Sequence, residues 1–166
     1  MVRIDRRVLD GTYIEVPAWG GDGRAATILK GPCGCGKTTG VNEKARSENL
    51  LQVRITVNRR FNENSHAAWL ELKDDDDDTF NYMDLLGASR EKRKEAEAKV
   101  TRILSERKGT IFVSVESFHR LWELGLKNIE RLDMFVIDET TEVAAKMLSK
   151  TSPKPHNFRL MRKVAA

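Results

Sequence analysis

The chain has 166 residues, 40% of them hydrophobic, and a formal net charge of +4, as expected for one globular domain that tolerates a nucleic acid partner. No apolar run approaches the ~20 residues that a membrane-spanning helix needs, and the opening MVRIDRRVLDG lacks the apolar segment of a secretory signal. We therefore expect an intracellular protein, nuclear or cytoplasmic, with no membrane partner. Its two cysteines are too few for a four-ligand structural zinc site.

Strand-like and helix-like patterns alternate along the first half of the chain. Residues 25–30 and 52–57 are short runs rich in apolar or β-branched residues, which predicts strands. Residues 38–51 follow a helical period. Residues 61–73 also read as a helix, with Phe61, Ala68, Trp69 and Leu72 available for a core-facing side.

The second half continues the alternation after five consecutive aspartates, residues 74–78, which predict a solvated loop. Residues 79–86 are a weaker strand candidate. Residues 89–108 predict a charged helix, whose apolar seam is made of Ala96, Val100, Ile103 and Leu104. Two nearly continuous apolar runs, 109–115 and 132–138, are typical of central strands in a parallel sheet. Helical patterns return at 141–150 and 157–166.

This order predicts a three-layer α/β fold with a mainly parallel sheet and right-handed crossovers. We expect residues 1–24 to form a lead-in segment and residues 25–166 to form the domain. The acidic loop 74–78 and the charged helix 89–108 would belong to that domain.

The segment GPCGCGKT, residues 31–38, fits the pattern G-x-x-x-x-G-K-[ST] of a phosphate-binding loop, also called Walker A. Glycines let successive backbone N–H groups point at phosphate oxygens, and the following helix adds the positive end of its dipole. The lysine can reach the β- and γ-phosphates and the threonine hydroxyl can ligate Mg²⁺. The predicted nucleotide-binding residues are Gly31, Pro32, Cys33, Gly34, Cys35, Gly36, Lys37, Thr38 and Thr39.

A second acidic group for the metal is offered by the sequence MFVIDE, residues 134–139. Asp138 would hold the Mg²⁺ shell together with Thr38, and Glu139 would position or activate the attacking water. Lys37, Asp138 and Glu139 are thus the predicted catalytic residues. The alternative is that the acidic pair caps the next helix.

Two further strand ends carry basic and polar residues. Because the carboxyl ends of parallel strands share one edge of a sheet, these residues would lie beside the phosphate loop. We expect them to contact a sugar-phosphate backbone. They are Arg59, Arg60, Ser117, His119 and Arg120. An alternative for SFHRL, residues 117–121, is a helix start with Phe118 and Leu121 in the core.

The succession GPCGCGKTT, ITVNRRF, VSVESFHRL and FVIDE resembles the first motor domain of superfamily 2 helicases. It is most similar to the herpesvirus-type replication origin-binding protein helicases. The resemblance implies a RecA-like P-loop NTPase that binds ATP and Mg²⁺ and acts on DNA, with RNA not excluded. It also implies a second RecA-like lobe, in cis or in trans.

The chain departs from that family after FVIDE, where the family continues with a coupling motif and a second motor domain. We therefore expect a C-terminally truncated form, a fragment or one module of a larger machine. Two other functions stay open at this point. One is a small-molecule phosphotransferase with the same phosphate loop, and the other is a nucleotide- or DNA-binding module without turnover.

Overall fold

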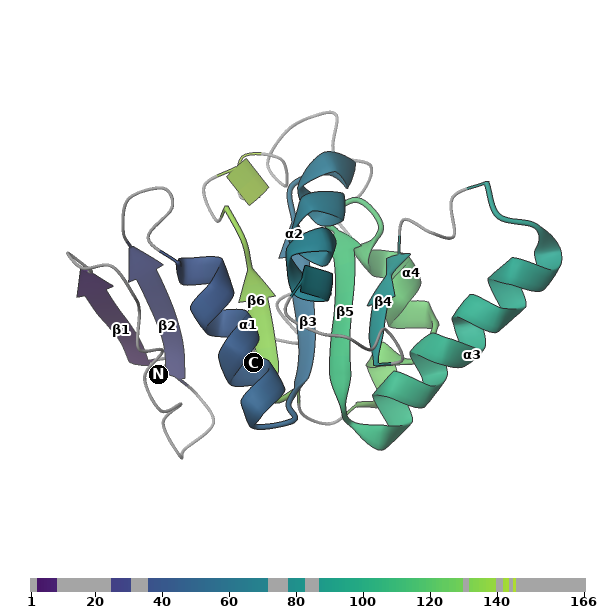
Figure 1. Cartoon of the computed structure of the whole chain (residues 1–166), viewed down its shortest axis with the longest axis horizontal. Coiled ribbons are helices and arrows are strands. Elements are labelled where there is room, and N and C mark those ends of the chain that lie inside the picture. Colours follow the sequence, from purple (N-terminus) through teal and green to yellow (C-terminus); the bar gives the residue numbers. More distant parts are fainter. Residues whose placement is uncertain are drawn as a thin grey trace.

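A computed structural model describes residues 3–8, 25–30, 36–71, 78–82, 87–129, 132–139, 142–143 and 145. Figure 1 shows the elements in chain order. They are β1 (Arg3–Val8), β2 (Ala25–Lys30), α1 (Lys37–Ser47), β3 (Leu51–Thr56), α2 (Arg59–Glu71), β4 (Thr79–Asn81), α3 (Arg90–Glu106), β5 (Gly109–Ser114), α4 (Phe118–Glu123), the 3-10 helix η2 (Leu126–Asn128) and β6 (Met134–Ile137).

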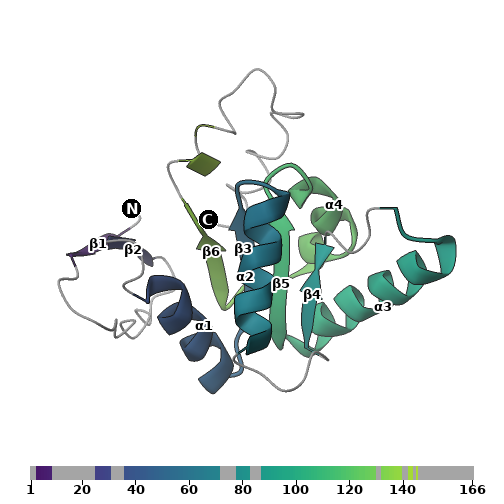
Figure 2. The ribbon, with the colours of Figure 1, turned by 45° about the horizontal axis from the view of Figure 1, so that its top comes forward.

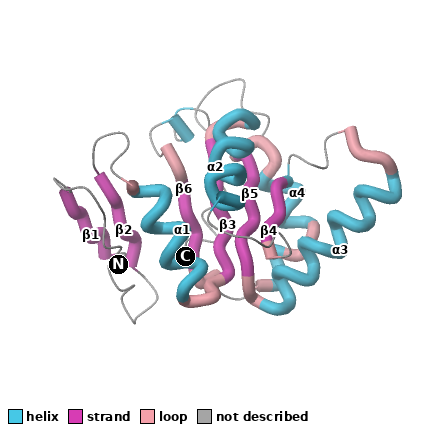
Figure 3. The backbone as a smooth tube through the Cα atoms, in the orientation of Figure 1, coloured by secondary structure: helices cyan, strands magenta, loops and turns pink. Residues whose placement is uncertain are grey.

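Four strands form an all-parallel sheet in the order β4-β5-β3-β6. The register pairs Thr56 with Ser114 and Ile55 with Ile137. The prediction of an α/β fold with a parallel sheet is therefore confirmed. Figure 3 shows helices on either side of these strands. Within the described part of the chain no helix is long and apolar enough to cross a membrane.

A second, two-stranded parallel sheet joins β1 to β2, with Arg3 opposite Ala25 and Val8 opposite Lys30. Figures 1 and 2 show this pair beyond α1, apart from β6. Strand β1 lies within residues 1–24, which were expected to form a lead-in segment and for which no element was predicted. Arginines interrupt the apolar pattern of β1, so only its pairing with β2 reveals it.

The two faces of the four-stranded sheet differ in polarity. Alternate residues of β3 and β5, such as Val53 and Ile111, join an apolar core with residues of α3 and α4, including Val100 and Phe118. The opposite face meets α1 and α2 and carries a smaller apolar cluster around Phe112. That face also buries the polar side chains of Gln52, Arg54, Thr56, Thr110 and Ser114.

Helix α3 matches its predicted extent closely. Ser89 is its N-cap and accepts the N–H of Lys92 at 3.3 Å. Val100, Ile103 and Leu104 are buried, as the predicted seam requires. Strand β4 is shorter than predicted: it ends at Asn81, and residues 83–86 lie outside the described residues, as do Leu72 and residues 74–77 of the acidic loop.

Two expectations for the core need correction. Trp69 is buried as predicted, but Phe61 is 42% exposed. Oδ1 of Asn58 accepts a hydrogen bond from the N–H of Phe61 at 3.2 Å, and α2 starts at Arg59, earlier than predicted. Phe61 therefore lies in the first turn of α2, at the edge of the sheet. Strand β6, predicted to be central, pairs on one side only, with β3, among the described strands.

The C-terminal predictions fall mostly outside the described residues. Of the predicted helix 141–150, the structure describes helical backbone at Glu142, Val143 and Ala145, and the pattern at 157–166 is not covered.

Candidate functional site

Helix α1 begins at Lys37, inside the predicted phosphate loop of residues 31–38. Residues 31–35 of that loop lie outside the described residues. Gly36 precedes the helix with φ 78° and ψ 13°, a left-handed conformation that favours glycine. The N–H of Gly40 donates to the Gly36 carbonyl at 2.8 Å and starts the helical pattern. The first turn contains no acidic residue, so its N–H groups keep their positive potential for an anion.

The carboxyl ends of three strands meet at the edge where α1 begins (Figure 1). The N–H of Asp138 donates to the Ile55 carbonyl at 3.0 Å, and the N–H of Val115 donates to the Thr56 carbonyl at 2.9 Å. These bonds extend the ladders one residue past β6 and β5. Asp138 is therefore fixed beside the end of β3 and on the same face as Thr56.

A buried arginine connects this edge to α1. The Arg54 side chain is 1% exposed, and its Nη1 donates to Oδ2 of Asp138 at 3.0 Å. Its Nη2 donates to Oδ1 of Asn42 at 2.5 Å. Burial lowers the pKa of Arg54, and the charge and hydrogen bond of Asp138 oppose that change. Asn42, Arg54 and Asp138 thus form one polar cluster across α1, β3 and the end of β6, in which Asn42 and Arg54 are buried and Asp138 is half-buried.

The same cluster orients the start of α1. Thr38 and Asn42 are four residues apart, so they share one helix face, with Thr38 a turn closer to the helix start. Thr38 is half-buried and Thr39 is exposed, in agreement with this orientation. The face of α1 that carries Thr38 is therefore the face turned toward Arg54 and Asp138.

The oxygens of Thr38 and Asp138 suit Mg²⁺, which binds one or two protein oxygens together with nucleotide phosphates and waters. The described residues contain no group of three or more His, Cys, Asp or Glu side chains that could hold a metal ion by themselves.

Glu139 follows at an unusual backbone conformation. Its φ is 51°, which is uncommon for a residue other than glycine, and it is exposed. Its carbonyl accepts the N–H of Val143 at 3.0 Å, so a helical turn starts here. Both interpretations of the acidic pair, catalytic and helix-capping, stay open for Glu139.

Arg59 and Arg60, two of the predicted nucleic-acid contacts, are exposed at the start of α2. Arg59 also pairs with Glu63 at 2.7 Å, one helical turn away. The aromatic ring of Phe61 lies exposed next to them. The helical spacing of Phe61 matched the core-facing side of the predicted helix, so the sequence pattern did not indicate a surface position for it.

The other predicted contacts surround the start of α4. Ser117 occupies the N-cap position but makes no side-chain cap hydrogen bond. His119 Nδ1 lies 3.1 Å from the Glu116 carbonyl, and Arg120 is exposed and donates to the Tyr82 hydroxyl at 3.4 Å. Phe118 and Leu121 are fully buried, so the core packing of the alternative interpretation is confirmed.

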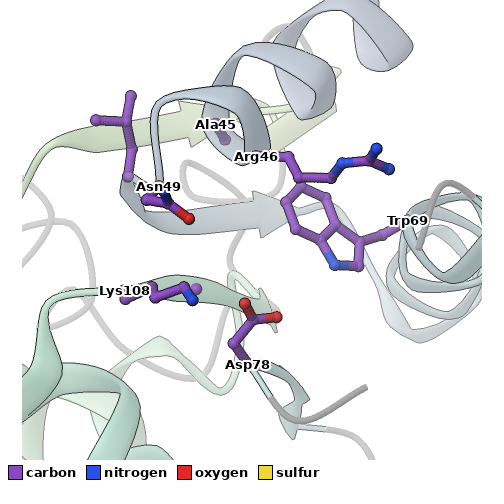
Figure 4. A pocket seen from close by; sticks show the side chains of 8 residues that line it. Ala45, Arg46, Asn49, Trp69, Asp78 and Lys108 are labelled. Carbon is purple, nitrogen blue, oxygen red and sulfur yellow. The ribbon is translucent and has the colours of Figure 1, made fainter. Parts of the chain in front are cut away.

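A cavity of about 220 Å³ lies at the opposite edge, where the strands begin (Figure 4). Gly109 starts β5 and Leu50 immediately precedes β3, so this cavity is separate from the edge that carries Asp138. Its lining consists of Ala45, Arg46, Asn49, Leu50, Trp69, Asp78, Lys108 and Gly109.

Comparisons with protein-family models, with curated proteins and with solved structures found no match for this chain.

Proposed function

We propose that this chain binds Mg-ATP at the carboxyl edge of its sheet, as the first RecA-like lobe of a DNA helicase or replication origin-binding protein. The observation that carries the proposal is the cluster of Asn42, Arg54 and Asp138. It ties the carboxylate that follows β6 to the helix that opens with Lys37 and Thr38. A phosphate loop and a metal-binding carboxylate need this proximity in order to hold one nucleotide.

Each residue then has a chemical role. Lys37 pairs with the β- and γ-phosphate oxygens, and the N–H groups at the start of α1 add further donors. Thr38 and Asp138 hold the metal. Mg²⁺ neutralises the charge of the phosphates when it is bound. Glu139, exposed beside Asp138, orients the attacking water.

Nucleic acid would lie along the same edge, over the starts of α2 and α4. Arg59, Arg60 and Arg120 are exposed there and can contact phosphates. Such contacts carry no sequence information, so binding by this chain should be weak, salt-dependent and nearly independent of sequence.

The nucleotide site is tested with Lys37→Ala and with the matched control Lys44→Ala. Lys44 lies on the same helix but near its C-terminal end, where it pairs with Glu48. We expect Lys37→Ala to weaken ATP binding roughly 10²-fold, because a charge-assisted contact with the terminal phosphates is lost. Lys44→Ala should bind like the wild type.

Isothermal titration calorimetry with ATP and Mg²⁺ measures the affinities, and circular dichroism verifies that each variant is folded. Equal affinity in the folded Lys37→Ala variant and the wild type would contradict the assignment of Lys37 to the nucleotide site. ATPase activity that rises with single-stranded DNA separates a helicase lobe from a small-molecule phosphotransferase.

A further inference from the structure

Arg54 is a charged side chain in the interior of the sheet, on strand β3. Its side chain is 1% exposed, while that of its ion-pair partner Asp138 is 28% exposed. A charge in the interior is costly unless a partner compensates it. Among the described residues, Asp138 is the only carboxylate that forms an ion pair with Arg54.

Arg54 is poorly suited to a purely structural role. Its Nε is buried and has no hydrogen-bond partner among the described residues, and an unpaired buried donor costs stability. Apolar residues of similar volume often replace a buried ion pair without loss of stability. A charged residue kept at such a place indicates a role in the neighbouring site.

The guanidinium group holds two neighbours in a fixed relation. Nη1 binds Oδ2 of Asp138, and Nη2 binds Oδ1 of Asn42. Because the guanidinium is planar and rigid, these two bonds set the orientation of the carboxylate relative to α1. They leave Oδ1 of Asp138 without a hydrogen bond to any described residue.

We infer that Arg54 is the positioning residue of the nucleotide site: it holds one oxygen of Asp138 so that the other is presented to a nucleotide-bound metal, and through Asn42 it fixes that oxygen relative to the start of α1. This role rests on the proposed function. If Arg54 has this role, the effect of Mg²⁺ on ATP affinity depends on Arg54 as well as on Asp138.

The charge of Arg54 has an effect on metal affinity that is opposite to the effect of positioning Asp138. The positive charge of Arg54 repels Mg²⁺, so a residue that only contributed charge would weaken metal binding, and its removal would strengthen it. A residue that positions a metal ligand has the reverse effect, because loss of such outer partners lowers metal affinity about 10–100-fold. The direction of the change therefore distinguishes the two roles.

The experiment compares ATP binding with excess Mg²⁺ and with EDTA, by isothermal titration calorimetry. The readout is the metal enhancement, the ratio of the two affinities. Arg54→Met, which has similar volume and no charge, should lower the enhancement roughly tenfold and leave the affinity for metal-free ATP unchanged.

The matched control is Gln52→Met. Gln52 lies two residues earlier on β3, on the same face, and is equally buried. Its Nε2 also has no hydrogen-bond partner in the part of the chain that the structure describes. It contacts Thr110 at 3.4 Å, so its replacement should not alter the metal enhancement. In an Asp138→Asn background, Arg54→Met should have no further effect on the enhancement.

An unchanged or increased enhancement in folded Arg54→Met overturns the inference. If Arg54→Met does not fold, Asn42→Leu takes its place, since it keeps the pair of Arg54 and Asp138 but cuts the tie to α1. That variant should lower the enhancement as well, and an unchanged value contradicts the role. If the wild type binds no ATP, the proposed function itself is contradicted. That result is distinct from a change, or a lack of change, in the metal enhancement of the variants.

Discussion

Buried amides and hydroxyls fix the edge of the sheet where the proposed site lies. Thr56 Oγ1 lies 3.2 Å from Oδ1 of Asn62, and Asn62 Nδ2 donates to Oδ1 of Asn81 at 2.6 Å. This buried chain of side chains joins the end of β3 to α2 and β4. Because every member is buried, the bonds hold α2 in one position. The exposed residues in the first turn of α2 are therefore presented from a fixed base.

Phe61 is the exposed large hydrophobic side chain of the described residues, at 42%. It follows Arg59 and Arg60, and an aromatic ring beside cations suits stacking with an unpaired base. We predict that Phe61→Ala weakens binding of single-stranded DNA by about 1–3 kcal/mol, the usual cost of losing one stacked base. Fluorescence anisotropy with a labelled oligonucleotide measures the change.

Phe61→Tyr is the control, because it keeps the aromatic face and should retain binding. Replacing Arg59, Arg60 and Arg120 together should instead flatten the dependence of affinity on salt. Equal affinities for Phe61→Ala and the wild type would contradict the stacking role.

At the scale of elements, Gly109 controls how β5 begins beside β4. Its φ is +107°, and a Cβ built there would lie 2.1 Å from the backbone oxygen of Asp78. The N–H of Thr110 donates to that same oxygen at 2.9 Å, so the two segments cannot move apart without losing this bond. Gly109→Ala should therefore strain the backbone and also disturb the packing of β4.

We predict that Gly109→Ala lowers the free energy of unfolding by about 1–3 kcal/mol more than Gly87→Ala does. Gly87 also has positive φ, at +77°, but nothing lies within 4 Å of its would-be Cβ. The control therefore carries backbone strain without the clash. Urea denaturation followed by circular dichroism measures both variants, and equal losses would show that the contact with Asp78 is unimportant.

Strand β6 is an apolar strand, Met134–Ile137, that pairs only with β3 among the described strands. Its other edge faces toward the separate pair of β1 and β2 (Figure 2). An unpaired apolar edge is a template for pairing with another chain.

For the whole molecule, the proposed function predicts that nucleotide binding and fast nucleotide hydrolysis need different parts of the helicase. The proposed function makes this chain a first helicase lobe, in which arginines from a second lobe would meet the charge that develops on the γ-phosphate. Such an arginine contributes roughly 10³–10⁵ in rate. We predict that these 166 residues alone bind Mg-ATP, hydrolyse it very slowly and do not unwind duplexes.

Steady-state phosphate release by purified monomer, with and without single-stranded DNA, measures the rate. Turnover on the order of 1 s⁻¹ or faster, which lies in the ordinary enzyme range, would show that a single lobe is sufficient if Glu139→Gln abolishes it. The same activity in Glu139→Gln would indicate a contaminating enzyme.

The sequence by itself determined most of the elements, because their signals are local. Apolar runs predicted β3 and β5, the apolar seam that contains Val100 predicted α3, and the glycines before Lys37 predicted where α1 starts. It also nominated Lys37, Thr38 and Asp138, whose residue types and spacing suit phosphate and metal chemistry. Their roles remain predictions.

Only the tertiary structure decided which distant residues meet. Arg54 reads as an interruption in an apolar strand, and its partners Asn42 and Asp138 are 12 and 84 residues away. The exposure of Phe61 and the pairing of β1 were likewise invisible in the sequence. The physical reason is the same for all of them. A periodic pattern records which side of an element faces inward, but the partner of a buried charge is set by sheet order and register, which depend on contacts between segments far apart in the chain.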